Sequence, residues 1–192
     1  MLKKQAKDFF LQKRKQYSLN EIEAKSKQIC KLFFDEISLI SIKNIHCFLP
    51  IVSQNEVNTY FVINYLLENH PNITISVPWC DERDNSMKSF VYQPNKLIKN
   101  KWNIEEPDPQ TAVEINQSSI DMVLVPLVVF DIQGHRVGYG KGFYDRFLAK
   151  CKPGIVKIGL CFENPIDKIV DTHIHDVVLD ICITPHAKYI FK

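Results

Sequence analysis

The stretch "DMVLVPLVVFDIQGHRVGYGKGFYDRFLAK", residues 121–150, decides the fold. It begins with the most apolar run of the chain, continues through a glycine-rich loop and ends in a segment that is typical of a short helix, 143–150. The apolar run 121–131 does not alternate with polar residues, which is typical of a central strand covered on both faces. Since proline has no N–H for a neighbouring strand, we expect the strand to bend or end at Pro126.

The segments on both sides of this stretch alternate between helical and strand patterns. Helices are expected over 2–17, from a capping box at Ser18–Glu21 to about Ile37, and over 57–69. Strands are expected over 45–50, 72–78, 86–93, 155–162 and 177–185. The polar, proline-broken segment 94–119 is expected to be irregular. Together these patterns predict one α/β domain over residues 1–192, a three-layer α/β/α arrangement with a mostly parallel, Rossmann-like sheet.

The first expected helix is rich in lysine. Its apolar stripe contains Leu2, Ala6, Phe9, Phe10 and Tyr17. Beside or opposite this stripe lie Lys3, Lys4, Lys7, Arg14 and Lys15. Lys13 projects into the stripe, so its amine either reaches the surface along the helix or meets an anion at the edge of a cleft.

Composition excludes several classes of protein. The longest apolar run, 122–130, is too short to cross a bilayer, and the N-terminal segment lacks the apolar core of a signal peptide, so we expect a cytoplasmic protein. A net charge of +2 does not by itself indicate a nucleic-acid partner. The six cysteines form no CxxC pair, which excludes a legible zinc or thioredoxin motif. Free thiols are expected, and an oxidised pair remains open.

The glycine loop has the composition of a phosphate site. Glycine occupies every second position of 138–142, so the backbone can approach a ligand closely and turn N–H groups toward an anion. Arg136 and Lys141 add full positive charges, and a helix beginning near Phe143 adds its N-terminal end. The spacing matches neither the Walker A motif nor the dinucleotide fingerprint. From the glycines alone, a flexible turn without a ligand remains an equal alternative.

The flanking residues change that balance. "VPLVVFDIQGHRVGYGKGFYDRFL", residues 125–148, closely resembles the signature of the 5-formyltetrahydrofolate cyclo-ligase family, VPxxxFDxxGxRLGxGxGYYDxxL. The proline, the Phe-Asp pair, the Gly-x-Arg, the spaced glycines and the Tyr-Asp pair are all kept together. The resemblance extends to the lysine-rich start, to "NEVNT" (55–59), to "WNIEEP" (102–107) and to an aspartate before "ITP" (183–185).

The resemblance implies an enzyme that closes a ring at the expense of ATP. Such a ligase converts 5-formyltetrahydrofolate to 5,10-methenyltetrahydrofolate through a phosphorylated formyl group and releases ADP and phosphate, with Mg²⁺ as cofactor. We therefore expect a cytoplasmic monomer whose partners are small molecules, with no nucleic acid and no membrane.

The resemblance also implies roles for individual residues. The catalytic residues would be Arg136 and Lys141. ATP would be bound by Lys3, Lys7, Arg136, Val137, Gly138, Tyr139, Gly140, Lys141, Gly142, Phe143 and Tyr144. The folate would be bound by Leu49, Glu56, Tyr139 and Phe143, with the Glu56 carboxylate accepting hydrogen bonds from the pterin. Mg²⁺ would be held by Asp145 and Asp176.

Plainer interpretations exist for several of these residues. Lysines on a helix usually form a solvated face, Asp176 is equally typical of a turn, and core packing explains Leu49 and Phe143. Tyr139 departs from many members of the family, which carry Arg, Lys or Met there, and Lys7 stands where some carry Arg.

Two other functions remain open at this stage. A sugar-phosphate isomerase-like enzyme would use the glycine loop for a substrate phosphate without ATP. A non-catalytic RNA-binding module would use the lysine-rich first helix, although no aromatic RNP-type strand is present. The HxH pair His173 and His175 is interpreted as a surface pair, because no third metal ligand is evident nearby in the sequence.

Overall fold

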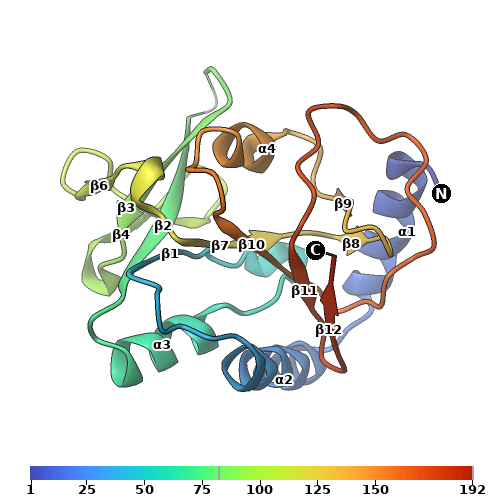
Figure 1. Ribbon diagram of the computed structural model, residues 1–192, viewed down its shortest axis with the longest axis horizontal. Helices are drawn as coiled ribbons and strands as arrows, with labels where there is room; N and C mark the ends of the chain where they lie inside the picture. Colours follow the sequence, from blue (N-terminus) through green and yellow to red (C-terminus); the bar gives the residue numbers. More distant parts are fainter. Residues whose placement is uncertain (82, 192) are drawn as a thin grey trace.

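The computed structural model describes residues 1–81 and 83–191 of the chain. Its centre is an eight-stranded sheet in the order β12-β11-β10-β7-β1-β2-β3-β6 (Figure 1). These strands are β1 (Asn44–His46), β2 (Thr74–Asp81), β3 (Ser86–Val91), β6 (Glu114–Ile115), β7 (Met122–Pro126), β10 (Val156–Leu160), β11 (Ile181–Ile183) and β12 (Lys188–Ile190). Neighbours from β11 to β2 are parallel, whereas β12, β3 and β6 pair antiparallel. The predicted α/β class with a mostly parallel sheet is confirmed.

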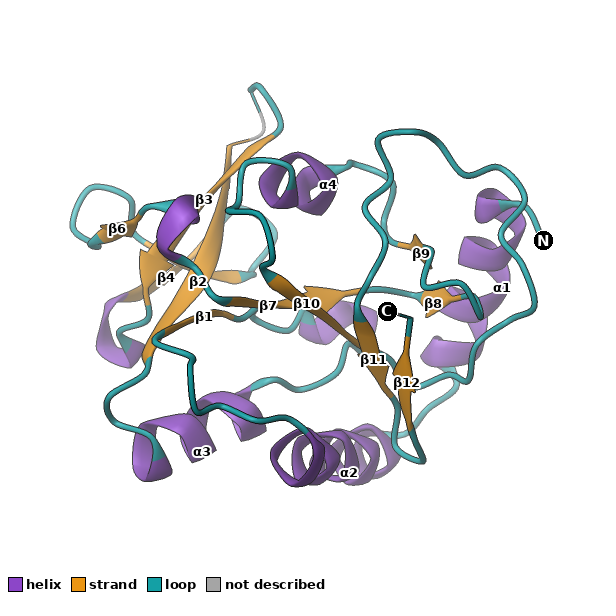
Figure 2. Cartoon of the chain, viewed as in Figure 1, coloured by secondary structure: helices purple, strands orange, loops and turns teal. Residues whose placement is uncertain are grey.

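Helices cover both faces of this sheet. They are α1 (Lys3–Lys15), α2 (Leu19–Glu36), α3 (Tyr60–Asn69) and α4 (Phe143–Leu148). Figure 2 shows α2 and α3 below the sheet, α4 above it, and α1 beside the small hairpin of β8 (Val129–Phe130) and β9 (Arg136–Val137). The capping box predicted at Ser18 is present, because its side chain accepts a hydrogen bond from the Glu21 N–H at 3.3 Å.

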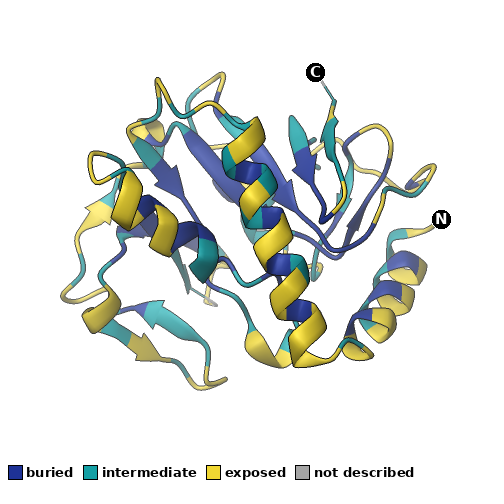
Figure 3. Cartoon of the chain, turned by 90° about the horizontal axis from the view of Figure 1, so that it is seen from below, coloured by how far each residue is buried: buried dark blue, intermediate teal, exposed yellow. Residues whose placement is uncertain are grey.

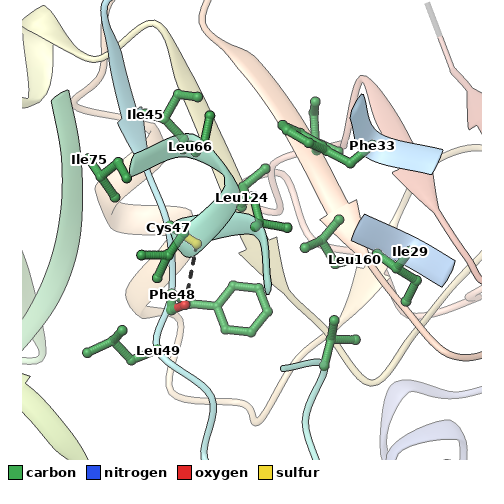
Figure 4. Packing of buried hydrophobic residues seen from close by; sticks show 14 of the residues in the cluster. Ile29, Phe33, Ile45, Cys47, Phe48, Leu49, Leu66, Ile75, Leu124 and Leu160 are labelled. Carbon is green, nitrogen blue, oxygen red and sulfur yellow. Dashed lines mark hydrogen bonds between the residues drawn. The ribbon is translucent and has the colours of Figure 1, made fainter. Parts of the chain in front are cut away.

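Two apolar clusters hold the layers together. Below the sheet, Ile29 and Phe33 of α2 point toward Leu124 and Leu160 of the strands (Figure 4). Each of these side chains is fully or almost fully buried, and burying one stabilises the fold by about 1.5–3 kcal/mol. A second cluster lies under α4 and includes Phe147. Figure 3 shows this face from below, with the exposed residues of α2 and α3 on their outer faces and the buried ones toward the sheet.

Pro126 ends the central strand, as predicted. It is the last residue of β7 and lies opposite Leu160 of β10. The chain then turns into the β8–β9 hairpin, which the apolar pattern did not predict because each strand has only two residues. Gly134 lies in this hairpin with φ +84°, and a Cβ there would come within 2.7 Å of the Phe191 ring, so the position requires glycine.

Two predictions about local structure need correction. The segment expected to be irregular, 94–119, contains the hairpin of β4 (Leu97–Lys99) and β5 (Glu105–Pro107), as well as β6. These strands are too short to give a periodic pattern. The long strand expected at 177–185 shrinks to β11, and β12, which was not predicted, pairs with it.

The first helix buries only part of the predicted apolar stripe, together with one residue outside it. The buried residues of α1 are Ala6, Phe10 and Arg14, whereas Phe9 is 57% exposed. An arginine on the inner face was not expected, because its charge argued for solvent. Its guanidinium finds carbonyl partners inside the fold, so the buried face follows the i, i+4, i+8 spacing of this helix despite the charge.

The direction of the connections reverses between β1 and β7. From β1 the chain passes through α3 to β2 on one side, and from β7 it passes through α4 to β10 on the other side. In open α/β sheets ligands bind beyond the carboxyl ends of the strands at such a reversal of direction. The segment after β1 carries Glu56, and the segment after β7 carries the glycine loop, so both lie at this position.

The described cysteines are all free thiols, as expected: Cys30, Cys47, Cys80, Cys151, Cys161 and Cys182. Among the helices of the described residues, none is both long and apolar enough to span a membrane.

Candidate active site

The loop 138–142 joins β9 to α4. Gly140 has φ +94° and Gly142 has φ +67°, backbone conformations that side-chain-bearing residues rarely adopt. Gly138 is different, because its φ is not positive and a Cβ built there would meet nothing within 4 Å. The open space beside Gly138 is a cradle that a side chain would fill, and it lets a bound group approach the loop amides.

Arg136, at the start of β9, is held by two acceptors. Its side chain is only 6% exposed, donates to Asp145 Oδ1 at 2.6 Å and also donates to the carbonyl of Val177. Asp145 Oδ1 in turn accepts the N–H of Val177 at 3.0 Å. The guanidinium is therefore fixed between α4 and the segment before β11, next to the glycine loop.

Lys3 and Lys7 of α1 reach the same region. The Lys3 ammonium forms an ion pair with Asp176, and the Lys7 ammonium donates to the carbonyl of Tyr139 at 2.6 Å. Asp176 also accepts the N–H of His173 at 2.6 Å. The two lysines one turn apart thus face the glycine loop, and the interpretation as a freely solvated face does not apply to them.

The electrostatics of Asp176 are those of a carboxylate kept ionised. Burial raises its pKa, but the hydrogen bond from Lys3, the N–H of His173 and the charges of Lys3 and Arg136 outweigh burial and leave the pKa below its usual value. Arg136 pairs with Asp145 and donates to the carbonyl of Val177, the residue that follows Asp176, so the guanidinium lies between the segments that carry the two carboxylates.

Glu56 lies beyond the carboxyl end of β1. Its side chain is buried, with 6% exposure, and one carboxylate oxygen accepts the N–H of Ile51 at 2.7 Å. Burial raises its pKa, and the N–H of Ile51, a hydrogen bond from the Tyr139 hydroxyl and the charge of Arg14 oppose that rise without cancelling it. Glu56 is therefore a desolvated carboxylate whose neighbours in the structure are mostly neutral.

The two apolar residues predicted for the folate are not brought together. Leu49 packs in the cluster below the sheet, and Phe143 packs against the cluster under α4. Tyr144 also lies in the first turn of α4, with its hydroxyl buried and without a hydrogen-bond partner in the part of the chain that the structure describes.

Comparison with known proteins now bears on this arrangement. Residues 2–185 match the 5-formyltetrahydrofolate cyclo-ligase family. The chain belongs to this family. A probable 5-formyltetrahydrofolate cyclo-ligase of Schizosaccharomyces pombe is 26% identical, and the match covers 85% of each chain. The prediction that this chain is an enzyme of the ligase class is confirmed by its membership.

Solved structures of similar proteins share the fold. The NMR structure of 5,10-methenyltetrahydrofolate synthetase from Aquifex aeolicus has a TM-score of 0.76 at 24% identity and covers all of this chain and 94% of its own. The 5,10-methenyltetrahydrofolate synthetase of Mycoplasma pneumoniae has a TM-score of 0.73 at 25% identity and covers 97% of this chain and 100% of its own. The α/β architecture of this cyclo-ligase family member is thus that of solved synthetases.

The donors of Asp145 and Asp176 fit a magnesium ion. Mg²⁺ prefers hard oxygen ligands and is usually held by one or two carboxylates together with substrate phosphates. Within the described residues, no group of three or more His, Cys, Asp or Glu side chains could hold a metal without such help. The exposed pair His173 and His175, with ring centroids 5.0 Å apart, belongs to no such group either.

Sequence reasoning missed two neighbours of the glycine loop. The first is Arg14, which is 3% exposed and donates to the carbonyl of Leu127 at 2.7 Å and to the Tyr139 hydroxyl at 3.3 Å. It follows Lys7 by two helical turns, and this spacing was the signal that could have found it.

The second is Trp102. The ammonium of Lys141 lies 5.5 Å from the centroid of the Trp102 ring, which is half exposed. The two residues are far apart in the sequence, and no local pattern predicts their contact. This cation–π contact brings the segment 102–107 to the glycine loop.

Proposed function

We propose that this cyclo-ligase family member converts 5-formyltetrahydrofolate to 5,10-methenyltetrahydrofolate with consumption of ATP and with Mg²⁺ as cofactor. One observation carries the proposal: Lys3, Arg136, Asp145 and Asp176 meet beside the glycine loop, at the same edge of the sheet as the buried carboxylate of Glu56. Cations and a flexible backbone suit a nucleotide, and a desolvated carboxylate suits a pterin.

On the nucleotide side, the residues present fit a triphosphate. Lys3 and Lys7 would turn their ammonium groups from Asp176 and the Tyr139 carbonyl toward phosphate oxygens, and the amides of 138–142 would line the phosphates. Arg136 would donate its planar fork to the transferring phosphoryl group, where negative charge is spread over the oxygens. Lys141 would add a second charge at the loop.

Mg²⁺ would be held by Asp145 and Asp176, and it would supply neutralisation of the phosphate charge. In the structure these carboxylates pair with Arg136 and Lys3. When these two cations bind phosphate oxygens instead, the carboxylates would become free to bind the metal ion. Phosphoryl transfer depends mainly on positioning and charge neutralisation, so a covalent protein nucleophile is not needed.

On the folate side, Glu56 would orient the pterin. A carboxylate can accept two hydrogen bonds, from the 2-amino group and from a ring N–H. Leu49 and Phe143 pack in different clusters, so each would provide an apolar contact to a different part of the folate.

The chemistry proceeds in two steps. The formyl oxygen attacks the γ-phosphorus, the bond to ADP breaks, and the formyl carbon becomes an iminophosphate on N5. The folate N10 then attacks this carbon, its proton is lost, and phosphate leaves with the C–O bonding electrons to give the methenyl bridge. Water would be a poor leaving group from the same carbon, which is why ATP is needed.

The two alternatives have less support. Three of the α1 lysines that an RNA-binding module would use already have partners within the protein: Lys3 with Asp176, Lys7 with Tyr139 and Lys13 with Glu163 at 2.5 Å. An isomerase-like enzyme would require no nucleotide, and the assay below separates the two functions directly.

The test follows the absorbance of the methenyl product after mixing the protein with 5-formyltetrahydrofolate, Mg²⁺ and ATP. We expect product only when ATP is present and almost none with Arg136→Ala. The matched control is Arg83→Ala, since Arg83 also pairs with an aspartate, Asp81, but is exposed on the β2–β3 hairpin. Product without ATP, or no product from folded wild-type protein, contradicts the proposal.

A further inference from the structure

Arg146 of α4 connects the glycine loop to the β2–β3 hairpin. Its guanidinium donates to the Lys141 carbonyl at 2.6 Å and to the Asn85 carbonyl at 2.8 and 3.0 Å. Asn85 directly precedes β3, and Figure 1 shows the β2–β3 hairpin rising beside α4. One side chain therefore joins the end of the glycine loop to a segment that lies 61 residues before it in the sequence.

This contact fixes the direction of one peptide group of the loop. Arg146 holds the carbonyl of Lys141, and the peptide bond between Lys141 and Gly142 is trans. In a planar trans peptide the C=O and the N–H point in opposite directions, so the N–H of Gly142 points away from Arg146. The direction of an amide that is proposed to line the phosphates thus depends on Arg146.

The two ends of the glycine loop differ in how closely they are packed. A Cβ built on Gly142 would come within 2.9 Å of Arg146 Nη1, and the Arg146 guanidinium lies 5.7 Å from the centroid of the Phe143 ring. A Cβ built on Gly138 would meet nothing within 4 Å. The loop is therefore anchored at the end that leads into α4 and open at the end that follows β9.

The hairpin holds the acceptor of this contact in place. Asn85 has φ +55°, in the left-handed region that asparagine adopts more readily than most other residues with a side chain. The Asp84 carboxylate accepts the N–H of Ser86 at 2.8 Å, and β3 pairs with β2 along its whole length. The Asn85 carbonyl is therefore a fixed point to which Arg146 can tie the loop.

We propose that Arg146 is a positioning residue for the nucleotide, which orients the Gly142 amide by tying the end of the glycine loop to the β2–β3 hairpin. This inference rests on the proposed function and adds a residue to its nucleotide side. The Arg146 side chain is exposed, and two backbone carbonyls already accept its donors, so it acts through the loop.

The first experiment is steady-state kinetics of methenyl formation, with ATP and 5-formyltetrahydrofolate varied in turn. Arg146→Ala should raise the KM for ATP roughly 5- to 10-fold, as expected for one lost hydrogen bond, and leave the KM for folate within about 2-fold. The Tm should stay within about 2 °C, because the side chain is exposed. Arg146→Lys should recover only part of the loss, since an ammonium lacks the fork that reaches both carbonyls.

Two substitutions at Asn85 test the hairpin end of the contact. Asn85→Val should displace the carbonyl, because a β-branched residue is strained at positive φ, and should also raise the KM for ATP. Asn85→Gly keeps the backbone conformation and should keep the wild-type KM. In the Arg146→Ala protein, Asn85→Val should add almost nothing, because the contact is already lost.

Hydrogen exchange of the unliganded protein tests the anchor independently of activity. The amides of 138–142 should exchange faster in Arg146→Ala. The matched control is Arg83→Ala, since the Arg83 guanidinium bonds to Asp81 of its own hairpin at 2.9 Å. The control should keep the wild-type exchange rates and both KM values.

The outcomes separate this inference from the proposed function. If Arg146→Ala raises both KM values by the same factor, or leaves the KM for ATP unchanged, the inference is wrong and the proposed function stands. Unchanged exchange of 138–142 in Arg146→Ala also overturns the inference. If folded wild-type protein forms no methenyl product, the proposed function fails, and the nucleotide role of Arg146 fails with it.

Discussion

The two sides of the proposed site treat charge in opposite ways. On the nucleotide side two of the cations already pair with a carboxylate, Arg136 with Asp145 and Lys3 with Asp176, and the pKa of Asp176 lies below its usual value. On the folate side the carboxylate of Glu56 is buried and accepts the backbone N–H of Ile51, and burial holds its pKa above the usual value. The nucleotide side therefore contains ion pairs, whereas the folate side contains one carboxylate that is shielded from solvent.

This difference suggests how each side would respond to its ligand. A triphosphate can replace the carboxylates as partner of Arg136 and Lys3, so that charge is exchanged and little new desolvation is needed. Folding has already removed water from Glu56 at a cost in free energy, and hydrogen bonds from a pterin would offset that cost. We therefore expect the buried carboxylate on the folate side to lower the stability of the unliganded protein and to favour folate binding. The ion pairs on the nucleotide side should not lower stability.

The largest expected effect is at Arg136. Arg136→Ala should lower kcat about 1000-fold or more, since an arginine that stabilises a transferring phosphoryl group contributes 10³–10⁵ in kcat. Arg136→Lys keeps the charge without the fork, and we expect it to recover only a small part of the rate. The measurement is steady-state kinetics of methenyl formation. A lysine variant with wild-type kcat would mean that charge alone matters at this position.

Glu56→Gln is expected to have the next largest effect, on the folate side. Loss of charged hydrogen bonds to the pterin should lower kcat/KM by roughly 10- to 100-fold, mainly through the KM for folate. The KM for ATP should change little. If instead the KM for ATP rises and the KM for folate does not, Glu56 acts in nucleotide binding and not in folate binding.

Gly138→Ala separates ligand binding from stability. Because φ at Gly138 is not positive and the added Cβ meets nothing within 4 Å, we expect an unchanged or slightly higher Tm. The methyl group would occupy the open space beside the loop, so the KM for ATP should rise roughly 10-fold by loss of close backbone approach.

Gly154→Ala is the matched control for that variant. Its Cβ also meets nothing within 4 Å, but Gly154 has φ +80° and lies in the turn before β10. It should lower the Tm, because alanine is strained there, and leave the KM for ATP unchanged. If the KM for ATP rises in Gly154→Ala, or does not rise in Gly138→Ala, the glycine loop does not bind the nucleotide as proposed.

The sequence predicted the parts of this arrangement that depend on local pattern. The strand that ends at Pro126 and the capping box at Ser18 each follow from neighbouring residues, and each is confirmed. The conversion of 5-formyltetrahydrofolate, the residue roles and the single domain over 1–192 stay predictions. A single cooperative unfolding transition would support the last of these.

Contacts between segments that are far apart in the sequence could not be predicted from local sequence patterns. The partners of Arg14 lie more than 110 residues away, and those of Lys3 lie 168 and 173 residues away. The sequence of a single helix does not show whether a lysine pairs with an aspartate or is solvated. Two-residue strands such as β8 and β9 were missed for the same reason, since tertiary packing and not periodicity defines them.

The smallest effect concerns stability and pH, where the two sides should differ in sign. Asp176 has a lowered pKa in the fold, so its contribution to stability is present above the unfolded pKa of about 3.9 and is lost as the pH falls through the folded pKa. Asp176→Asn should therefore lower the Tm by a few degrees at pH 7 and by less at pH 3. The control Asp35→Asn, in an exposed helix pair with Lys31, should change the Tm little at either pH.

Glu56 has a raised pKa, so its sign is reversed. The neutral form is favoured in the fold, and its contribution is complete below the unfolded pKa of about 4.3 and is lost as the pH rises through the folded pKa. Glu56→Gln, which keeps an acceptor for the Ile51 N–H, should raise the Tm at pH 7 and match wild type at pH 4. Thermal unfolding of both variants at the two pH values decides the matter: shifts of the same sign at pH 7 would show that the two carboxylates are held alike, whereas opposite signs would show that the folate side alone is built at the expense of stability.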